Sequence, residues 1–220
     1  MLMKTSSRLS MILLLALGLG LGSKDAAASK LPELLAQIEK VYTREATLKT
    51  EFTQTDFVSS TQVTKRSSGS IFFKRPNRVR WETHSPDRNL LVSNGKKFWF
   101  YTPPFDETEK GQVIERKSAE VQSQLAQTLL SGNLSGTRGM RIKSLDANRF
   151  KLTPPKKTAG TIADIELTVS SQTLRITQLI LNHRGGNKTT IDLNQIEFGV
   201  PMGDEFFEFT PPPNTDRIDP

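Results

Sequence analysis

The sequence contains no cysteine, which excludes disulfide bonds, thiol catalysis and zinc sites with cysteine ligands. It also excludes the lipid-modified cysteine that would anchor a bacterial lipoprotein. Histidine is scarce: only His84 and His183 are present, and neither has the spacing of a metal-binding motif. No serine occupies a G-x-S-x-G nucleophile elbow, and no glycine-rich loop has phosphate-binding spacing. We therefore expect no enzyme, no catalytic residue, no metal site and no cofactor.

Long apolar runs are also missing, apart from one short run near the start. Residues 11–21 are apolar, follow the positive charges of Lys4 and Arg8, and precede the small residues 26–28. This pattern is typical of a cleavable secretory signal, and the run is too short to span a bilayer. We expect cleavage after Ala28, which leaves residues 29–220 as a single domain. Export without an anchor predicts a protein of the periplasm or of the exterior.

The charge balance is basic, with a formal net charge of +7. The predicted signal holds Lys4, Arg8, Lys24 and Asp25, a net of +2, so +7 minus +2 leaves about +5 for the mature chain. A basic surface favours acidic partners such as nucleic acid, anionic headgroups or an acidic protein face. Export makes nucleic acid the least expected of these partners. Solubility alone is the alternative explanation of the charge.

Two amphipathic helices are expected. Residues 31–48 carry apolar side chains at the spacing of one helical stripe, and Pro32 and Glu33 suit a first turn. Residues 119–131 form the second helix, with Gly132 as a natural stop. Apolar residues of the two helices include Leu34, Leu35, Ile38, Leu125, Leu129 and Leu130.

Most of the remaining chain predicts strands, because segments rich in Phe, Val, Ile and Thr alternate with turn residues. Asn94-Gly95 and Gly185-Gly186 are strong hairpin turns, since these residues tolerate positive φ. Hairpins make the sheet antiparallel, and many short strands indicate a sandwich, a barrel or a strongly curved sheet. Residues after Pro213 are expected to form a loose tail. The predicted strands are 49–58, 68–74, 78–83, 89–93, 96–101, 141–145, 149–152, 163–169, 174–182 and 188–198.

The strand Phe98-Trp99-Phe100-Tyr101 is apolar on both faces, whereas a sheet with one wet face alternates apolar and polar residues. Something apolar must therefore cover each face, and the two helices are the expected covers. A sandwich core with a partly covered outer face is one interpretation. A concave sheet filled by helices, and at times by a ligand, is the more specific interpretation.

The run from Lys74 to Trp81 places Arg78 and Arg80 on one side of a strand and Val79 and Trp81 on the other. Stacking of single-stranded nucleic acid requires aromatic and basic side chains on one surface. The alternation therefore favours Val79 and Trp81 inside an apolar interior, with both arginines outside.

Several short motifs, in this order, resemble the LolA-type periplasmic outer-membrane lipoprotein carriers. They are Phe52-Thr53-Gln54, residues 69–73, Lys74-Arg75-Pro76-Asn77 with Trp81, residues 91–95 with Trp99-Phe100-Tyr101 and Pro103, and Phe207-Glu208-Phe209-Thr210-Pro211-Pro212. The resemblance covers about residues 31–213. It implies a mainly β (α+β) protein: an unclosed, strongly curved antiparallel β-barrel with α-helices as a lid over its concave apolar face.

The resemblance also implies a function and its residues. The cavity binds acyl chains of lipoproteins that an inner-membrane ATP-driven transporter releases, and a monomeric carrier delivers them to an outer-membrane acceptor lipoprotein. Arg75 corresponds to a latch that hydrogen-bonds the lid backbone and keeps it shut. The lid helices correspond to Leu34, Leu35, Ile38, Leu125, Leu129 and Leu130. The cavity residues are Phe52, Phe73, Val79, Trp81, Leu91, Trp99 and Tyr101.

Two other functions stay open from the sequence. A periplasmic lipid-sensing or regulatory module could use the same half-barrel to bind a lipid or a protein without any transfer step. An undetected hydrolase is a further alternative, although no residue stands out as its nucleophile or base.

Overall fold

The computed structural model describes residues 31–106, 108–117, 124–137, 139–155 and 160–218, without the side chains of 124–126, 135 and 136. The expected signal segment, residues 1–28, lies outside the described residues. None of the helices within these ranges is long and apolar enough to cross a membrane.

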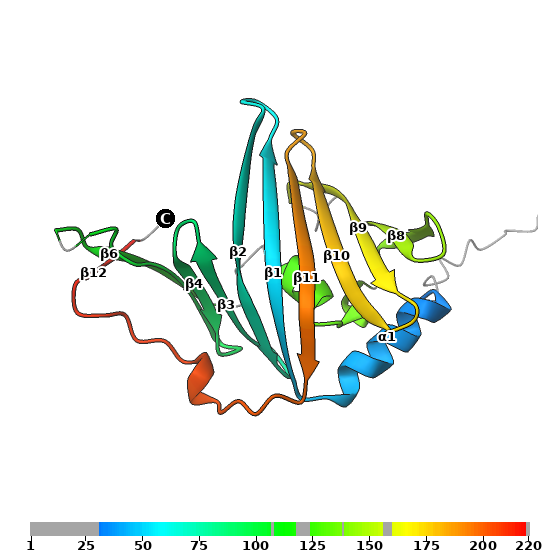
Figure 1. Cartoon of the computed structure of the whole chain (residues 1–220), viewed down its shortest axis with the longest axis horizontal. Coiled ribbons are helices and arrows are strands. Elements are labelled where there is room, and N and C mark those ends of the chain that lie inside the picture. Colours follow the sequence, from blue (N-terminus) through cyan, green and yellow to red (C-terminus); the bar gives the residue numbers. More distant parts are fainter. Residues whose placement is uncertain (1–30, 107, 118–123, 138, 156–159, 219–220) are drawn as a thin grey trace, which may run out of the picture.

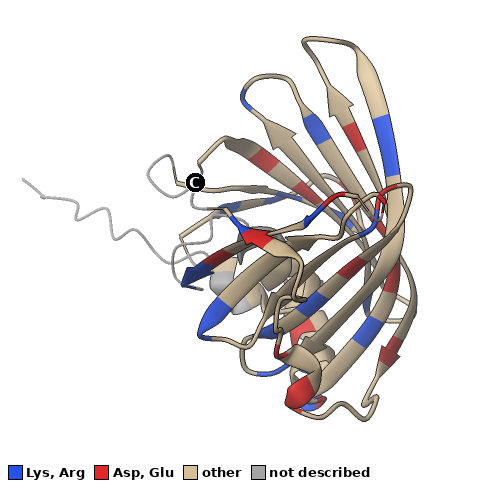
Figure 2. Cartoon of the chain, turned by 90° about the vertical axis from the view of Figure 1, so that its left-hand side faces the viewer, with Lys and Arg blue, Asp and Glu red and all other residues tan. Residues whose placement is uncertain are grey.

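One 12-stranded sheet dominates the fold, in the order β12-β6-β5-β4-β3-β2-β1-β11-β10-β9-β8-β7 (Figure 1). Its neighbours are antiparallel except β12 and β6, which run parallel. Because β12 and β7 remain edges, the sheet is unclosed, and it curls round the helices (Figure 2). The strands are β1 (Thr47–Val58), β2 (Val63–Lys74), β3 (Arg78–Ser85), β4 (Asn89–Ser93), β5 (Lys97–Thr102), β6 (Gly111–Lys117), β7 (Arg141–Ser144), β8 (Arg149–Thr153), β9 (Ile162–Ser170), β10 (Arg175–His183), β11 (Lys188–Phe198) and β12 (Thr215–Arg217).

The predicted hairpins form where the turn residues indicated. Gly95 has a φ of +90° between β4 and β5, and Gly186 has a φ of +83° between β10 and β11. All the predicted strand segments are strands, whereas β6 and β12 were not predicted. The expectation of a loose tail after Pro213 is wrong, because Thr215, Asp216 and Arg217 pair with the start of β6.

The first helix is shorter than its apolar pattern indicated. Helix α1 (Glu33–Arg44) ends before residue 48, because Thr47 already pairs with Lys74 in the ladder between β1 and β2. Helix α2 (Gln124–Leu130) is the described part of the second predicted helix, and residues 119–123 lie outside the description. Gly132 follows it with a φ of +71°, and its N–H donates to the Leu129 carbonyl. Short 3₁₀ turns form at η2 (Leu134–Thr137) and η3 (Glu205–Phe207).

The main core lies between the sheet and the helices. Alternate residues of β8 to β11 and of β1 and β2 face inward and pack with apolar side chains of α1, α2 and η2. We call this the inner face of the sheet. The fully buried strand residues in this core are Ile71, Leu152, Ile165, Leu167, Ile176 and Leu179.

The other face of strands β2 to β6, which we call the outer face, is covered by the chain that follows β11. This C-terminal strap, residues 199–218, crosses the strands before it joins the sheet as β12 (Figure 1). The ring of Phe206 packs edge-on against Phe72 at 5.0 Å, and Phe209 lies 5.2 Å from Tyr101. The expectation that the two helices cover both faces of the Phe98–Tyr101 strand is therefore wrong, because the strap covers the outer one.

Candidate functional site

Strand pairing places most of the predicted cavity residues on the inner face. Phe73 is paired with Val79, and Trp81 with Leu91, and directly opposed residues share a face. Phe52 meets Trp81 in an edge-to-face contact with ring centroids 4.9 Å apart. All five belong to the core cluster or pack against it, so the structure brings them together.

An apolar stripe continues this face toward the sheet edge. Trp81, Leu91, Phe100 and Ile114 stand opposite one another on β3 to β6, and all are half-buried. Phe100 and Ile114 were not among the predicted site residues. The alternation along Phe98-Trp99-Phe100-Tyr101 could have indicated Phe100, but Ile114 lies on a strand that was not predicted.

Trp99 and Tyr101 do not belong to this stripe, so their assignment to the cavity is corrected. They pair with Val92 and Leu90 on the outer face and form a separate apolar cluster with Val113 beneath Phe209. The sequence could not distinguish the two faces, because both the even-numbered and the odd-numbered residues of this strand are apolar.

The helices fill the inner face as the lid was expected to do. Leu35 and Ile38 of α1 and Leu129 and Leu130 of α2 are fully buried, and Leu34 packs against the core from its rim. Leu125 lies in α2, but its side chain is outside the described part of the chain. Leu134 of η2 is equally buried and was not predicted, since no periodic pattern surrounds it.

Arg75 joins the ends of the two helices. It follows β2 directly, and its guanidinium Nη2 donates to the carbonyl of Tyr42 at 2.9 Å and to that of Ser131 at 3.0 Å. Its Nε donates to the carbonyls of Tyr42 and Glu45, both at 3.3 Å. The last carbonyls of a helix lack partners within the helix, so a cation there is favourable. Burial lowers the pKa of Arg75 from its ordinary value, and the charge of Glu39 opposes that shift.

Tyr42 is the point where α1 meets both the sheet and α2. Its hydroxyl accepts a hydrogen bond of 3.0 Å from the backbone N–H of Ile176, and its ring packs edge-on against Phe198 at 4.9 Å. Burial raises the pKa of Tyr42 to about 12, while the Ile176 N–H and the charge of Arg175 oppose the rise. A Cβ atom on Gly132 would lie 2.2 Å from the Tyr42 ring, so the chain after α2 touches α1 through a glycine.

A cavity of about 340 Å³ opens beside this junction. Its walls are the hairpin between β2 and β3, the ends of both helices and inner-face aromatic residues. The amide Nε2 of Gln127 is buried in its wall and has no hydrogen-bond partner among the described residues. The lining residues are Tyr42, Glu45, Ala46, Thr47, Leu48, Phe73, Lys74, Arg75, Pro76, Asn77, Arg78, Val79, Ser93, Gly95, Phe98, Gln127, Thr128, Ser131 and Asn133.

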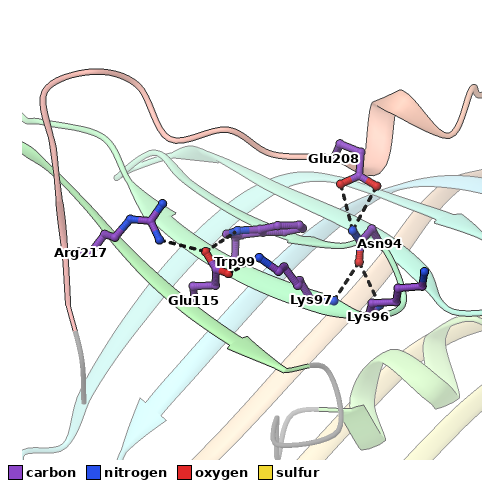
Figure 3. A network of polar contacts seen from close by, with 7 residues as sticks. All are labelled: Asn94, Lys96, Lys97, Trp99, Glu115, Glu208 and Arg217. Atoms are coloured by element: carbon purple, nitrogen blue, oxygen red, sulfur yellow. Dashed lines mark hydrogen bonds and ion pairs between the residues drawn. The ribbon is translucent and has the colours of Figure 1, made fainter.

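Polar contacts fix the C-terminal strap to the outer face (Figure 3). The carboxylate of Glu208 accepts hydrogen bonds of 2.9 and 3.1 Å from the amide of Asn94. Glu115 accepts from Lys97 at 2.6 Å, from the Trp99 indole at 3.3 Å and from Arg217 at 3.4 Å. The hydrogen bond from Lys97 is the largest cause that lowers the pKa of Glu115. The strap is therefore bound along its length, from η3 to β12.

Catalytic groups do not gather in the part of the chain that the structure describes. No cluster of His, Asp and Glu there has the arrangement of a metal site. His84 lies 3.5 Å from Glu82, and His183 lies 3.1 Å from the hydroxyl of Thr161; both contacts are exposed. What the inner face offers is apolar surface rather than reactive groups.

The fold and the site together define an open, half-barrel protein whose helical lid covers an apolar inner face. The chain belongs to the LolA family, since the family model described as "Outer membrane lipoprotein carrier protein LolA" matches residues 44–210.

Related proteins align with most of this chain. The outer-membrane lipoprotein carrier protein of Coxiella burnetii (strain RSA 493 / Nine Mile phase I) is 25% identical over 94% of this chain and 97% of its own length. That of Azotobacter vinelandii (strain DJ / ATCC BAA-1303) is 30% identical over 84% and 87%. The crystal structure of an uncharacterized conserved protein from Thermus thermophilus matches with a TM-score of 0.50 at 12% identity, over 84% of this chain and 98% of that one. The last likeness concerns the fold alone.

The close approach of Gly132 to Tyr42 predicts that Gly132→Ala separates the two helices. We expect a loss of about 2 to 4 kcal/mol in unfolding free energy, from left-handed backbone strain plus overpacking. Amide exchange in α1 and at Ile176 should accelerate. Gly139→Ala is the matched control, because Gly139 also has a positive φ, +88°, but an added Cβ there meets nothing within 4 Å. Urea unfolding and hydrogen exchange measure both; equal losses in the two variants would contradict the contact.

The raised pKa of Tyr42 predicts a stability loss at high pH. The folded protein holds the phenol proton more tightly than the unfolded chain, so this stabilisation is complete below pH 10 and is lost as the pH rises through about 12. Tyr42→Phe removes the titration and leaves the Ile176 N–H unpaired, so it should be less stable at pH 8. The difference in unfolding free energy between parent and variant should decrease by up to about 3 kcal/mol between pH 10 and 12. A gap that stays constant in urea unfolding would rule out the buried phenol as the cause.

Proposed function

We propose that the protein is a periplasmic carrier that binds the acyl chains of lipoproteins and delivers them to an outer-membrane acceptor without catalysing a reaction. An inner-membrane ATP-driven transporter would release the cargo to it. The observation that carries this proposal is the lid: helices α1 and α2 bury apolar side chains on the inner face, and one guanidinium ties both helix ends. The names of its relatives as outer-membrane lipoprotein carrier proteins support the cargo class.

The inner face suits acyl chains because it is apolar over a long path. The half-buried stripe of Trp81, Leu91, Phe100 and Ile114 lies on the same face as the lid-covered core. Each methylene that leaves water contributes roughly 0.8 kcal/mol. An acylated protein therefore requires such a surface in order to cross an aqueous compartment.

The cavity beside the latch suits the polar end of an acyl chain. Its wall holds the unpartnered amide nitrogen of Gln127 together with the hydrocarbon surfaces of Phe73, Val79 and Phe98. A buried donor without a partner costs free energy, and a carbonyl oxygen of an ester or amide would satisfy it. We propose this cavity as the point where a chain enters beneath the lid.

Lid and cargo would compete for one surface, which gives the protein two states. In the closed state the leucines of α1 and α2 occupy the inner face, and in the loaded state acyl chains replace them. Arg75 would then set the balance, because its fixed fork of donors serves carbonyls of both helices only when they lie together. Cargo release follows when the closed state is restored.

A transfer assay tests the carrier role. Inner-membrane vesicles that contain the active transporter and a labelled acylated lipoprotein are mixed with the purified protein, and the supernatant is analysed. We expect a soluble one-to-one complex that loses its label to added outer membranes. Cargo that stays in the vesicles, while a related carrier protein extracts it, would contradict the proposal. Extraction without any hand-off would instead favour a lipid-sensing module.

Arg75→Leu tests the latch in the same assay. Loss of charge-assisted hydrogen bonds, each contributing roughly 1.5 to 3 kcal/mol, should shift the lid toward the open state. Uptake should persist, whereas delivery to outer membranes should fall by about tenfold or more, as each 1.4 kcal/mol is a factor of ten. Arg149→Leu is the matched control, since the exposed Arg149 guanidinium pairs with Asp146 and touches neither a helix end nor the cavity wall. Equal delivery rates for Arg75→Leu and the parent would refute the latch.

A further inference from the structure

The far ends of two long hairpins form a single platform. Strands β1 and β2 turn at residues 59–62, and strands β10 and β11 turn at residues 184–187, and both turns project from the same side of the sheet (Figure 1). Ser59 joins them: its N–H donates to Asn187 Oδ1 at 2.9 Å, and its hydroxyl donates to the Gly185 carbonyl at 2.6 Å. We call residues 58–66 and 183–188 the tip platform.

The tip platform carries only positive charge. Lys65, Arg66, Arg184 and Lys188 are exposed, and residues 58–66 and 183–188 contain no Asp or Glu. None of these cations forms an ion pair with another residue in the described ranges. In Figure 2 blue segments lie at and just below the tips of the projecting hairpins, with a red segment beside them further down the strands.

The nearest carboxylate on these hairpins is already engaged. Asp56 stands opposite Lys65 in the ladder, yet its oxygens accept hydrogen bonds from Gln54 at 2.7 Å and from Thr189 at 2.6 Å. No ion pair joins Asp56 to Lys65 among the described residues, so the Lys65 ammonium is available to an outside anion. The chain gives these cations no internal role, because neither the core nor the lid contacts require them.

We infer that the tip platform docks the protein on an anionic lipid surface. The projecting turns can touch a plane, and long lysine and arginine side chains suit phosphate headgroups. A protein interface of useful affinity instead buries aromatic or other apolar anchors. The exposed large hydrophobic residue of this platform is Val63, 45% exposed, which suits shallow contact with a headgroup layer rather than a protein pocket.

The position of the platform is compatible with the rest of the molecule. Strand β1 runs from Thr47 beside the latch to Val58 at the platform, which separates the two by about 35 Å at roughly 3.3 Å per residue. The platform shares no residue with the lid, the latch or the inner-face stripe. A protein docked by its tips therefore leaves the latch free, and failure of the carrier proposal would not affect this one.

Vesicle binding tests the inference. The full chain is expressed, the exported product is purified, and binding is measured by sedimentation with vesicles of phosphatidylethanolamine alone or with one-third phosphatidylglycerol. We expect tighter binding to the anionic vesicles, weakened by salt because charges are screened beyond about 8 Å at physiological ionic strength. Lys65→Glu/Arg66→Glu should weaken it by about tenfold or more, since each basic residue near an anionic surface contributes roughly fivefold.

The control is Arg141→Glu/Lys143→Glu, which changes the net charge equally on exposed residues of β7, away from the platform. We expect it to bind anionic vesicles within about twofold of the parent. Arg184→Glu/Lys188→Glu, on the second hairpin, should reproduce the loss of binding. If circular dichroism shows that Lys65→Glu/Arg66→Glu misfolds, this second variant replaces it. Equal losses in tip and control variants, no preference for anionic vesicles, or no vesicle binding at all would overturn the inference; the last result would leave an acidic protein as the partner.

Discussion

The inner face of this bent sheet is apolar across most of its width, and no such face can be left in water. Strands β8 to β11 and β1 to β3 all contribute apolar side chains to it, from Leu152 to Val79. The cover consists of two short helices that add no strand to the sheet. They are held by side-chain packing, by the Tyr42 hydroxyl and by Arg75. A cover attached in this way can leave without breaking the ladder of the sheet, which distinguishes it from an ordinary core.

The lid and a bound acyl chain would contribute similar free energies of apolar burial to the inner face. Leu35, Ile38, Leu129, Leu130 and Leu134 are fully buried, and at about 2 kcal/mol each they contribute about 10 kcal/mol of apolar burial to the closed state. An acyl chain of about 15 methylenes would gain about 12 kcal/mol on the same surface. In the proposed carrier cycle neither cover would dominate by a wide margin, so a few hydrogen bonds from Arg75 would be enough to decide which one occupies the face. A lid with much more apolar surface would exclude the cargo, and a lid with much less would not displace the cargo from the inner face.

The sequence predicted the elements with local signals and failed where the signal was tertiary. Asn94-Gly95 located a hairpin, and the 3.6-residue period located α1, because both depend on neighbours in the chain. The double-sided strand at Phe98–Tyr101 indicated a cover on each face, and the strap is the cover of the outer one. Trp99 was nevertheless assigned inward, since a period of two separates two faces without indicating which of them is concave. The strap was missed because Phe206, Phe207 and Phe209 follow no period and are flanked by prolines. Strand β12, at Thr215–Arg217, is too short to have a pattern, and its pairing depends on β6.

The hairpin between β2 and β3 contacts both the helical lid on the inner face and the strap on the outer face. The strength of these contacts bears on how the lid would open. On one side Arg75 is bonded to partly buried backbone carbonyls of the helix ends. On the other side Lys74 and Arg78 pair with Asp204 of the strap at 2.6 and 2.9 Å, but Asp204 is 61% exposed, and such pairs contribute only about 0 to 1 kcal/mol. The hairpin itself is fixed by the ladder in which Phe73 faces Val79. Because the ladder holds Arg75 in place whatever the strap does, opening of the lid in the proposed cycle would require the helices to leave the guanidinium, and Arg75 would remain where it could bind them again.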